Sequence, residues 1–330
     1  MRPRTFSGVQ PTGSLHLGNY LGALKQWVRH QDERENVFCI VDLHALTIPE
    51  VVKPDQLRRD GRALAAMFVA CGIDPGRSTV FVQSHVREHA ELAWVLSCVT
   101  PLGWVERMTQ FKSKSEGRET IGSGLLMYPT LQAADIVLYD TKLVPVGEDQ
   151  RQHIELARDV AARFNHLFGE TLVLPQATLP AAGARVMGFD EPTVKMSKSL
   201  ATNRPNHAVM LDEDPARVKK TIMRAVTDPG CEYTPEKASA GVVNLMSVLS
   251  AVSGESVAAI AGRYAGRGYG YLKGEVADAV VAELAPVRER YQRLMADPGE
   301  LDRLVANGAN QARAIAVPVM ERVRSAVGTN

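Results

Sequence analysis

The chain has 330 residues, of which 45% are hydrophobic and 23% charged, as in an average globular protein. This composition excludes intrinsic disorder, collagen-like repeats and small disulfide scaffolds. Lys and Arg number 38 against 37 Asp and Glu, and the net charge of +1 argues against a surface devoted as a whole to nucleic acid. A local basic patch remains compatible with it. The length predicts one large domain and a smaller one.

The sequence carries no pattern for export or membrane insertion. No apolar run approaches the roughly 20 residues of a spanning helix, and no apolar stretch follows the charged N-terminus. We therefore expect a cytoplasmic protein with no membrane partner. The cysteines have no neighbour at metal-knuckle spacing and are expected to be buried free thiols: Cys39, Cys71, Cys98 and Cys231.

Apolar β-rich runs alternate with amphipathic stretches in the first half. We expect strands at residues 5–10, 37–41 and 79–83, and helices at about 16–31, from 54 to 71 and at 88–99. Such alternation predicts an α/β fold, a doubly wound parallel sheet with helices on both faces. Ligands of such sheets bind beyond the carboxyl ends of the strands, at the switch point.

The pattern becomes helical after about residue 206, so we expect a C-terminal all-helical domain that begins near residue 190. The expected helices are 215–226, 242–252, 276–295 and 301–327, with a glycine-rich interruption at 266–271. The last of them could pack back on the first domain.

The segment Pro11-Thr12-Gly13-Ser14-Leu15-His16-Leu17-Gly18-Asn19 joins the first strand to the first helix. A tight turn that leads into a helix offers free N–H groups and a positive dipole end to a phosphate, and His16 adds a donor. The alternative interpretation is an ordinary turn with a surface histidine.

A second segment, Lys195-Met196-Ser197-Lys198-Ser199, reads as a short, polar, flexible loop with two cations three residues apart. Two ammonium groups there could neutralise the charge that develops on a leaving pyrophosphate. The alternative is a solvated basic loop at a domain boundary. Neither segment is decisive alone, but the pair is specific.

Together the two segments resemble the two signatures of class I aminoacyl-tRNA synthetases. The stretches at 6–11, 40–45 and 144–150 are similar to the tryptophanyl-tRNA synthetase branch, and the resemblance covers nearly the whole chain. It implies a Rossmann-like catalytic domain at 1–187 with a helical dimerisation insertion at about 85–140. It further implies a signature loop and anticodon-binding domain at 188–304, and a C-terminal helix at 305–330.

The resemblance also implies an ATP site. The matching positions are Gln10, Pro11, Thr12, Gly18, Asn19, Gly147, Glu148, Asp149, Val186, Lys195, Met196, Ser197, Lys198 and Ser199. It implies that His16, Lys195, Lys198 and Mg²⁺ share the phosphate charge, and that a lysine of the polar stretch 111–117, for which we choose Lys114, approaches the phosphates. Without the resemblance that stretch reads as a solvated loop, and Asp149 reads as a helix cap.

The tryptophan site is expected at residues 125–139. Pro129 fits a first helical turn, which places Leu131, Gln132 and Asp135 on one face. An aspartate in so apolar a helix needs a donor, and an indole offers one N–H. The resemblance assigns that role to Asp135, and Gln132 stands where many bacterial relatives carry methionine. The matching pocket positions are Asp135, Phe6, His44, Tyr128, Gln132, Val144, Val146 and Gln150.

The expected activity is therefore tryptophan–tRNA ligation, with ATP–Mg²⁺, L-tryptophan and tRNA(Trp) as substrates, in a homodimer. We expect neither an iron–sulfur cluster nor zinc, because Cys231 alone lies in the helical half. Three alternatives stay open: a tyrosyl-tRNA synthetase, a catalytically idle paralogue that senses tryptophan or binds RNA, and a nucleotidyltransferase with the same histidine turn. Retention of His16, Lys195 and Lys198 argues against the idle paralogue.

Overall fold

Five parallel strands form the centre of the first half in the computed structural model, which describes residues 2–117, 119–147, 150–178 and 184–329. The strand order is β3-β2-β1-β4-β5. The order reverses at β1, so the switch point lies between β1 and β4. The expected doubly wound, Rossmann-like sheet is confirmed. The strands are β1 Arg4–Val9, β2 Glu35–Ile40, β3 Ser78–Val82, β4 Leu143–Pro145 and β5 Gln176–Thr178.

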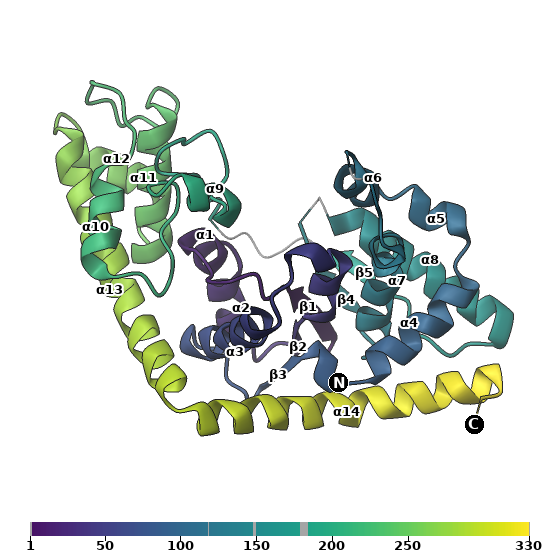
Figure 1. The fold of residues 1–330 in the computed structure, drawn as a ribbon. Helices are drawn as coiled ribbons and strands as arrows, with labels where there is room; N and C mark the ends of the chain where they lie inside the picture. The colour runs from purple at the N-terminus through teal and green to yellow at the C-terminus, as the bar shows by residue number, and fades with distance from the viewer. Residues whose placement is uncertain (1, 118, 148–149, 179–183, 330) are drawn as a thin grey trace.

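Helices cover the sheet and fill the crossover between β3 and β4, where α4 to α7 form an all-helical insertion (Figure 1). The first crossover is a helical stretch whose middle turn, η1, is π-helical. The helical elements of this half are α1 Leu17–Asn19, η1 Tyr20–Leu24, α2 Lys25–Arg29, η2 Leu43–Thr47, η3 Pro49–Val51, α3 Pro54–Ala70, η4 Gln83–His85, α4 Glu88–Val99, α5 Leu102–Glu106, α6 Thr109–Ser115, α7 Ser123–Val137 and α8 Arg151–Phe168.

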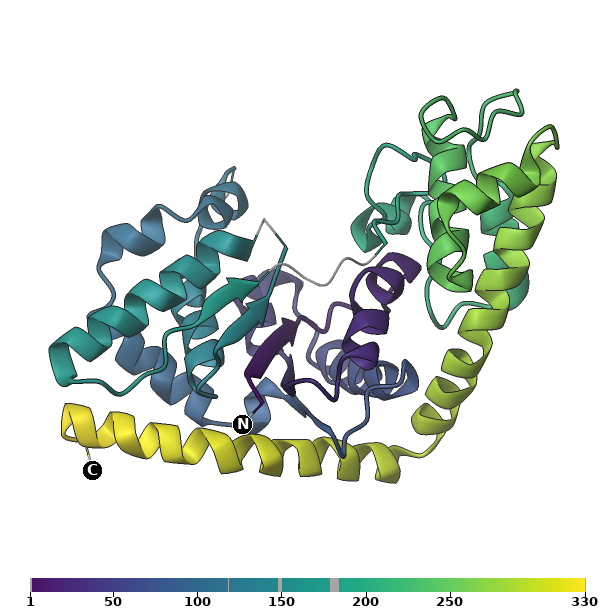
Figure 2. The ribbon, with the colours of Figure 1, turned by 180° about the vertical axis from the view of Figure 1, so that it is seen from behind.

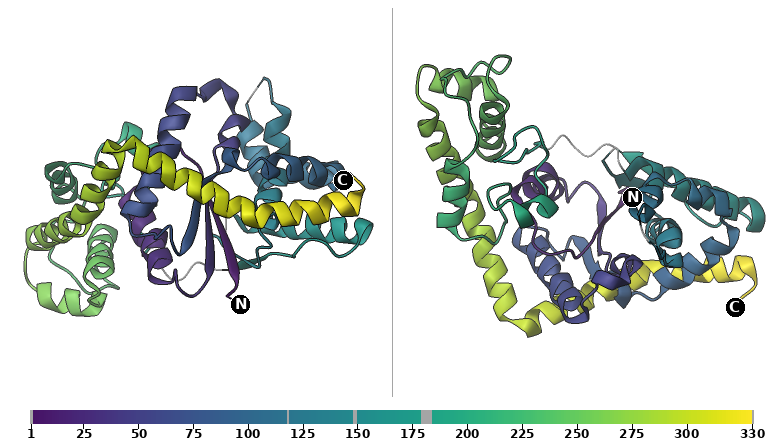
Figure 3. Two further views of the ribbon diagram at one scale, coloured as in Figure 1. Left: turned by 90° about the horizontal axis from the view of Figure 1, so that it is seen from below. Right: turned by 45° about the horizontal axis from the view of Figure 1, so that its top comes forward.

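Every regular element in the described residues of the second half is a helix, and the last of these helices returns beneath the sheet (Figures 1 and 2). From below, α14 crosses under the strands toward α4 (Figure 3). Arg324 pairs with Glu91 at 2.6 Å and Arg322 with Asp140 at 2.6 Å. The helices are α9 Lys198–Asn203, α10 Pro215–Met223, α11 Ala240–Ser253, α12 Val257–Tyr264, α13 Tyr269–Ala296 and α14 Pro298–Val327.

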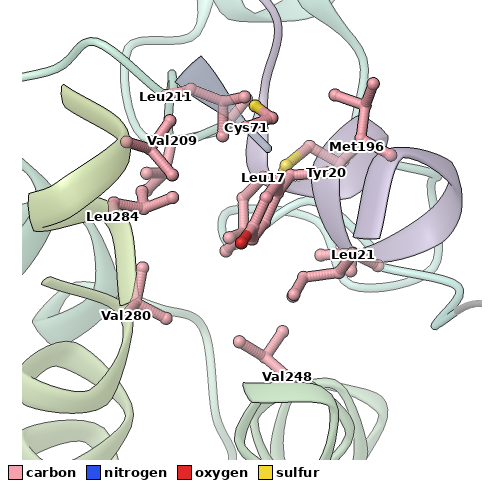
Figure 4. Packing of buried hydrophobic residues seen from close by; sticks show 14 of the residues in the cluster. Leu17, Tyr20, Leu21, Cys71, Met196, Val209, Leu211, Val248, Val280 and Leu284 are labelled. Carbon is pink, nitrogen blue, oxygen red and sulfur yellow. The ribbon is translucent and has the colours of Figure 1, made fainter. Parts of the chain in front are cut away.

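One hydrophobic core joins the two halves. Leu17 and Leu21, from the first helical stretch, pack in the same cluster as Met196, Val248 of α11 and Val280 of α13 (Figure 4). Apolar burial on this scale stabilises a fold by about 25 cal/mol per Å². The first helix therefore takes its position from the helical half as much as from the sheet.

Several sequence expectations were wrong in detail. Pro129 lies inside α7, which begins six residues earlier, at Ser123. Residues 109–115 form helix α6 rather than a loop. Only two of the four free cysteines, Cys39 and Cys71, are buried, whereas Cys98 and Cys231 are exposed. Neither α12 nor the three-residue strand β5 was expected.

Within the described residues, no single helix is long and apolar enough to span a membrane. The bent pair α11 and α12, at 117° to each other, meets the length and composition criteria together.

Candidate active site

The turn after β1 ends in a histidine that caps the first helix. The Nδ1 atom of His16 accepts a hydrogen bond from the Asn19 N–H at 3.3 Å, and Asn19 Oδ1 accepts one from the His16 N–H at 3.1 Å. This reciprocal capping box fixes the ring and leaves Nε2 as the atom that carries the proton in a neutral imidazole.

The expected set of free N–H groups at this helix start is largely used within the protein. The Leu17 N–H donates to the carbonyl of Val209 at 2.8 Å, and the Asn19 N–H serves the cap. His16 itself forms an isolated antiparallel bridge with Met210. A chain segment nearly 200 residues away in sequence thus braces the turn, so side chains contribute more to an anion site here than the predicted backbone donors do.

The second signature is more ordered than a flexible loop. The backbone of Lys195 forms an isolated antiparallel β-bridge with Met187. The Met196 N–H donates to the carbonyl of Val186 at 3.1 Å, and the Met196 side chain is buried. Ser197 then caps α9 by accepting from the Leu200 N–H at 3.3 Å. The expectation of a polar loop was therefore wrong for its middle, where Met196 anchors the segment in the core.

The two signatures meet at Gly13. Its φ of +90° suits glycine, and a Cβ there would lie 2.2 Å from Nζ of Lys198. That ammonium is buried and has no hydrogen-bond partner among the described residues. Burial lowers the pKa of Lys198 and outweighs the opposite effect of the nearby carboxylates of Asp60 and Asp212. A buried cation whose charge is only partly offset favours an anion beside it, so the geometry favours a phosphate at this point.

The same cations act on His16. Burial first, and then the charges of Lys195, His207 and Lys198, lower the pKa of His16 to about 4. The ring is consequently neutral at pH 7, and its Nε2–H can donate to a phosphate oxygen without adding a charge.

A cavity of about 360 Å³ lies at the switch point, between the ends of β1 and β4. Its volume is in the range of small-molecule sites. Gln10 and Lys114 line it too, as does the unpredicted Gln110. Every residue expected to hold tryptophan borders it: Phe6, His44, Tyr128, Gln132, Asp135, Val144, Val146 and Gln150.

The carboxylate of Asp135 is already bonded on both oxygens. Oδ1 accepts from Gln83 Nε2 at 2.5 Å and faces His89 Nδ1 at 2.6 Å, while Oδ2 faces His44 Nε2 at 2.7 Å. Burial alone would raise the pKa of Asp135, but the two histidines hold that pKa at about 2. The expectation that this aspartate waits for one donor was therefore incomplete, because only Oδ2 retains a free lone pair for an indole N–H.

Sequence reasoning had singled out His44 for the pocket, but it missed the two other partners of Asp135, Gln83 and His89. Gln83 directly follows β3 and could have been found, because it stands at the strand end where ligands of this fold bind. His89 is fully buried, and its Nε2 lies 2.7 Å from the Tyr139 hydroxyl, which extends the hydrogen-bond network. No periodicity or motif distinguishes His89 from an ordinary core residue.

A family model described as tRNA synthetases class I (W and Y) matches residues 1–285. The chain belongs to this family. A tryptophan–tRNA ligase of Wolinella succinogenes is 47% identical over 331 residues, 99% of each chain, and one of Thermosynechococcus vestitus is 48% identical over 98% of each.

Solved structures of tryptophanyl-tRNA synthetases are similar to this chain in fold. Tryptophanyl-tRNA synthetase from Campylobacter jejuni, in complex with ADP and tryptophan, superposes with a TM-score of 0.86 at 36% identity and covers 98% of this chain and 99% of its own. A tyrosyl-tRNA synthetase from Aeropyrum pernix reaches 0.65 at 18% identity, which shows the fold alone.

Other residues that the sequence predicts to bind ATP lie at the same edge of the sheet. Pro11 and Thr12 line a second cavity of about 290 Å³, which shares Gln10, His44 and Lys114 with the first. Val186 is buried beneath the second signature. Gly147 follows β4, whereas Glu148 and Asp149 lie outside the described residues.

Lys114 stands on helix α6 rather than on a loop. Its ammonium lies 5.2 Å from the centre of the Tyr128 ring, a cation–π distance, and burial lowers the pKa of Lys114. This placement puts Lys114 in the wall of the cavity that Asp135 borders. Among the described residues, no cluster of three or more His, Cys, Asp or Glu side chains could hold a metal ion.

Proposed function

We propose that this chain is a tryptophan–tRNA ligase. It activates L-tryptophan with ATP to tryptophanyl-adenylate and pyrophosphate, and then transfers tryptophan to the terminal ribose of tRNA(Trp). The observation that carries this proposal is the turn at residues 10–13. Gln10 borders the Asp135 cavity, residues 10–12 line the adjoining cavity, and Gly13 meets the ammonium of Lys198.

In the first step a tryptophan carboxylate oxygen attacks the α-phosphorus of ATP–Mg²⁺, and the bond from the α-phosphorus to the bridging oxygen breaks. Pyrophosphate leaves with the electron pair of that bond. The chain needs no nucleophile of its own, so catalysis consists of positioning and charge stabilisation. The neutral His16 donates from Nε2, and the ammonium groups of Lys195, Lys198 and Lys114 neutralise the leaving phosphates. Each well-placed donor contributes about 3 kcal/mol to the transition state.

The amino-acid cavity selects tryptophan through Asp135 and its apolar walls. The remaining lone pair of Oδ2 accepts the indole N–H, and Phe6, Val144 and Val146 pack against the ring. Phenylalanine would leave that lone pair without a donor, a mismatch that reaches roughly 10⁴-fold in comparable sites. Tyrosine also carries a donor, so the depth of the cavity rejects it.

The test is tryptophan-dependent ATP–pyrophosphate exchange, followed by charging of tRNA(Trp), with each of the twenty amino acids offered in turn. We expect exchange with tryptophan alone. Exchange with tyrosine would make the chain a tyrosyl enzyme, and binding of tryptophan without exchange would make it an idle paralogue. Asp135→Ala should reduce tryptophan activation far more than ATP binding.

The division of labour follows the family pattern. Residues 1–187 would catalyse the reaction, residues 188–304 would carry the second signature and bind the anticodon, and residues 305–330 would tie the two together. The adenosine would lie between Gly147, Val186 and the turn at residues 10–12. We place the enzyme in the cytoplasm.

A homodimer would form through the insertion between β3 and β4. Trp94 of α4 is 72% exposed and Leu102 of α5 is 58% exposed, which is unusual for large apolar side chains and typical of an interface. Trp94→Asp should convert the dimer to a monomer in light-scattering measurements. The matched control is Tyr271→Asp, a 68% exposed aromatic residue of α13, which should leave the dimer intact. A wild-type monomer would refute this assignment.

A further inference from the structure

A buried histidine lies directly behind the second signature, outside the residues that the sequence singled out. His207 is fully buried in the segment that follows α9. Its ring lies on the bare backbone of Gly188, where a Cβ would come within 2.3 Å of the ring Cε1. A side chain at position 188 would therefore displace the His207 ring, so the packing against Gly188 defines the position of that ring.

The two ring nitrogens of His207 face two different acceptors. Nδ1 lies 2.6 Å from Asp190 Oδ1, and Nε2 lies 3.4 Å from the main-chain carbonyl oxygen of Lys195. A carboxylate and a carbonyl can only accept, so the ring meets both partners when both nitrogens carry a proton. The imidazole thereby connects Asp190 to the backbone of a signature lysine.

Asp190 is itself held in place. Its Oδ2 lies 3.2 Å from Nε of Arg204, and Nη1 of the same guanidinium lies 2.5 Å from Glu191 Oε2. Arg204 directly follows α9, the helix that begins within the second signature. Polar contacts therefore run in series from Arg204 to Asp190, from Asp190 to His207, and from His207 back to Lys195 of the signature.

The carbonyl of Lys195 depends on this contact. Within the described residues, the neighbouring bonds run from the Gly188 N–H to the Val194 carbonyl and from the Met196 N–H to the Val186 carbonyl, and they leave the Lys195 carbonyl to His207. We propose that His207 is a positioning residue for the reaction: through its hydrogen bond to the Lys195 carbonyl, it fixes the direction in which that lysine presents its ammonium to the phosphates. This inference rests on the proposed function.

Two substitutions separate the two hydrogen bonds of the ring. His207→Asn puts an amide N–H near the position of Nδ1, so it keeps the bond to Asp190 and loses the bond to Lys195. His207→Gln reaches the position of Nε2, so it keeps the bond to Lys195 and loses the bond to Asp190. His166→Asn makes the same change at an exposed histidine of α8 and serves as the matched control.

The readout is kcat for tryptophan-dependent ATP–pyrophosphate exchange, together with the melting temperature of each variant. We expect His207→Asn to lower kcat by about 10-fold to 100-fold, the cost of a misplaced group, while the KM for tryptophan stays unchanged. His207→Gln should retain most of the rate, and His166→Asn should match the wild type.

A double-mutant cycle with Lys195→Ala distinguishes positioning from a general structural role. If His207 acts through Lys195, His207→Asn should cost nothing further in the Lys195→Ala background, where there is no ammonium to position. Losses that multiply, or equal losses for Asn and Gln that follow the melting temperature, would overturn the inference. A wild-type protein without exchange would instead refute the proposed function.

Discussion

The proposed amino-acid end of this site, at Asp135, and its proposed phosphate end, at Lys198, hold their buried charges in opposite ways. At the amino-acid end, Asp135 is buried and bonded by His44, Gln83 and His89, so the charge is satisfied before any ligand arrives. At the phosphate end, the ammonium of Lys198 is buried without a hydrogen bond from the described residues, and Asp60 and Asp212 offset the effect of that burial only in part. The hydrogen bonds of Asp135 fix the shape of the cavity that selects the tryptophan ring. The ammonium of Lys198 instead gains its compensating charge when an anion binds.

The largest effect should come from removing the unsatisfied cation. Lys198→Met keeps the apolar length of the side chain and deletes the charge. We expect kcat for exchange to fall by about 10²-fold to 10³-fold, because a charge that acts on the leaving phosphates is lost. The melting temperature should stay equal or rise, since the cost of burying this ammonium outweighs its attraction to Asp60 and Asp212 in the free protein.

The control for that comparison is Lys219→Met, at an exposed lysine of α10 that pairs with Asp278. It should change neither rate nor stability by a measurable amount. A marked loss of stability in Lys198→Met would contradict the idea that this cation waits for its anion.

The opposite result is expected at the amino-acid end. Asp135→Asn removes a charge that two histidines pair with, so the free energy of unfolding should fall by about 3 kcal/mol. The rate of tryptophan activation should fall too. Urea denaturation of the two proteins measures the difference. If the fold were as stable as the wild type while activation was lost, the network would serve binding alone.

Lowering the pH should reduce the free energy of unfolding over different pH ranges for Asp135 and for His16. The folded pKa of Asp135, about 2, lies below its ordinary 3.8, so its contribution is present above about pH 4 and is lost as the pH falls toward 2. The folded pKa of His16, about 4, lies below 6.5, so the fold loses stability from about pH 6.5 down to 4, where the unfolded chain takes up the proton first.

Each of these two shifts corresponds to a few kcal/mol at most, about 2 kcal/mol for Asp135. Urea unfolding across this pH range measures both, with Asp135→Asn and His16→Gln as the variants that remove each contribution. NMR of the His16 ring should show a neutral imidazole throughout the range from about pH 6 to 8. A ring that takes up its proton in that range would contradict the assignment of His16 as a neutral donor.

The smallest effect is expected at Gln132, one turn before Asp135 on α7. Its amide borders the cavity, and Gln132→Met is close to volume-conserving, so the change should cost less than about 1.5 kcal/mol in stability. We expect the KM for tryptophan to change by roughly 10-fold or less, read from exchange kinetics. A loss as large as that of Asp135→Asn would show that the amide binds the substrate directly.

Much of the sheet half was predictable because its pattern is local. The runs at 37–41 and 79–83 became β2 and β3 within two residues at either end, and the helix at 88–99 became α4 with the same limits. The short β5, Gln176–Thr178, was missed because three residues carry no period. Pro129 was misplaced because neighbouring helices stabilise α7 around a proline that propensity alone would put at its start.

The site was predictable where a residue follows a strand or stands in a signature. Gln10 and Val146 come after β1 and β4, and both border the cavity. Among the partners of Asp135, His89 could not be found in this way, since it lies within a helix and meets Asp135 only through tertiary packing. The anchoring of Met196 and the contact of Lys198 with Gly13 also depend on the whole fold.

The path of α14 has a consequence for how the enzyme is made. Its apolar residues Ala312, Ala316 and Met320 belong to the same core as Phe81 of β3, and Arg324 reaches Glu91. Because α14 follows strands β1 to β5 in the chain, the sheet is synthesised before this helix, and one of its flanks stays uncovered until α14 has left the ribosome. A message truncated before α14 would therefore yield an aggregation-prone fragment rather than a smaller working enzyme.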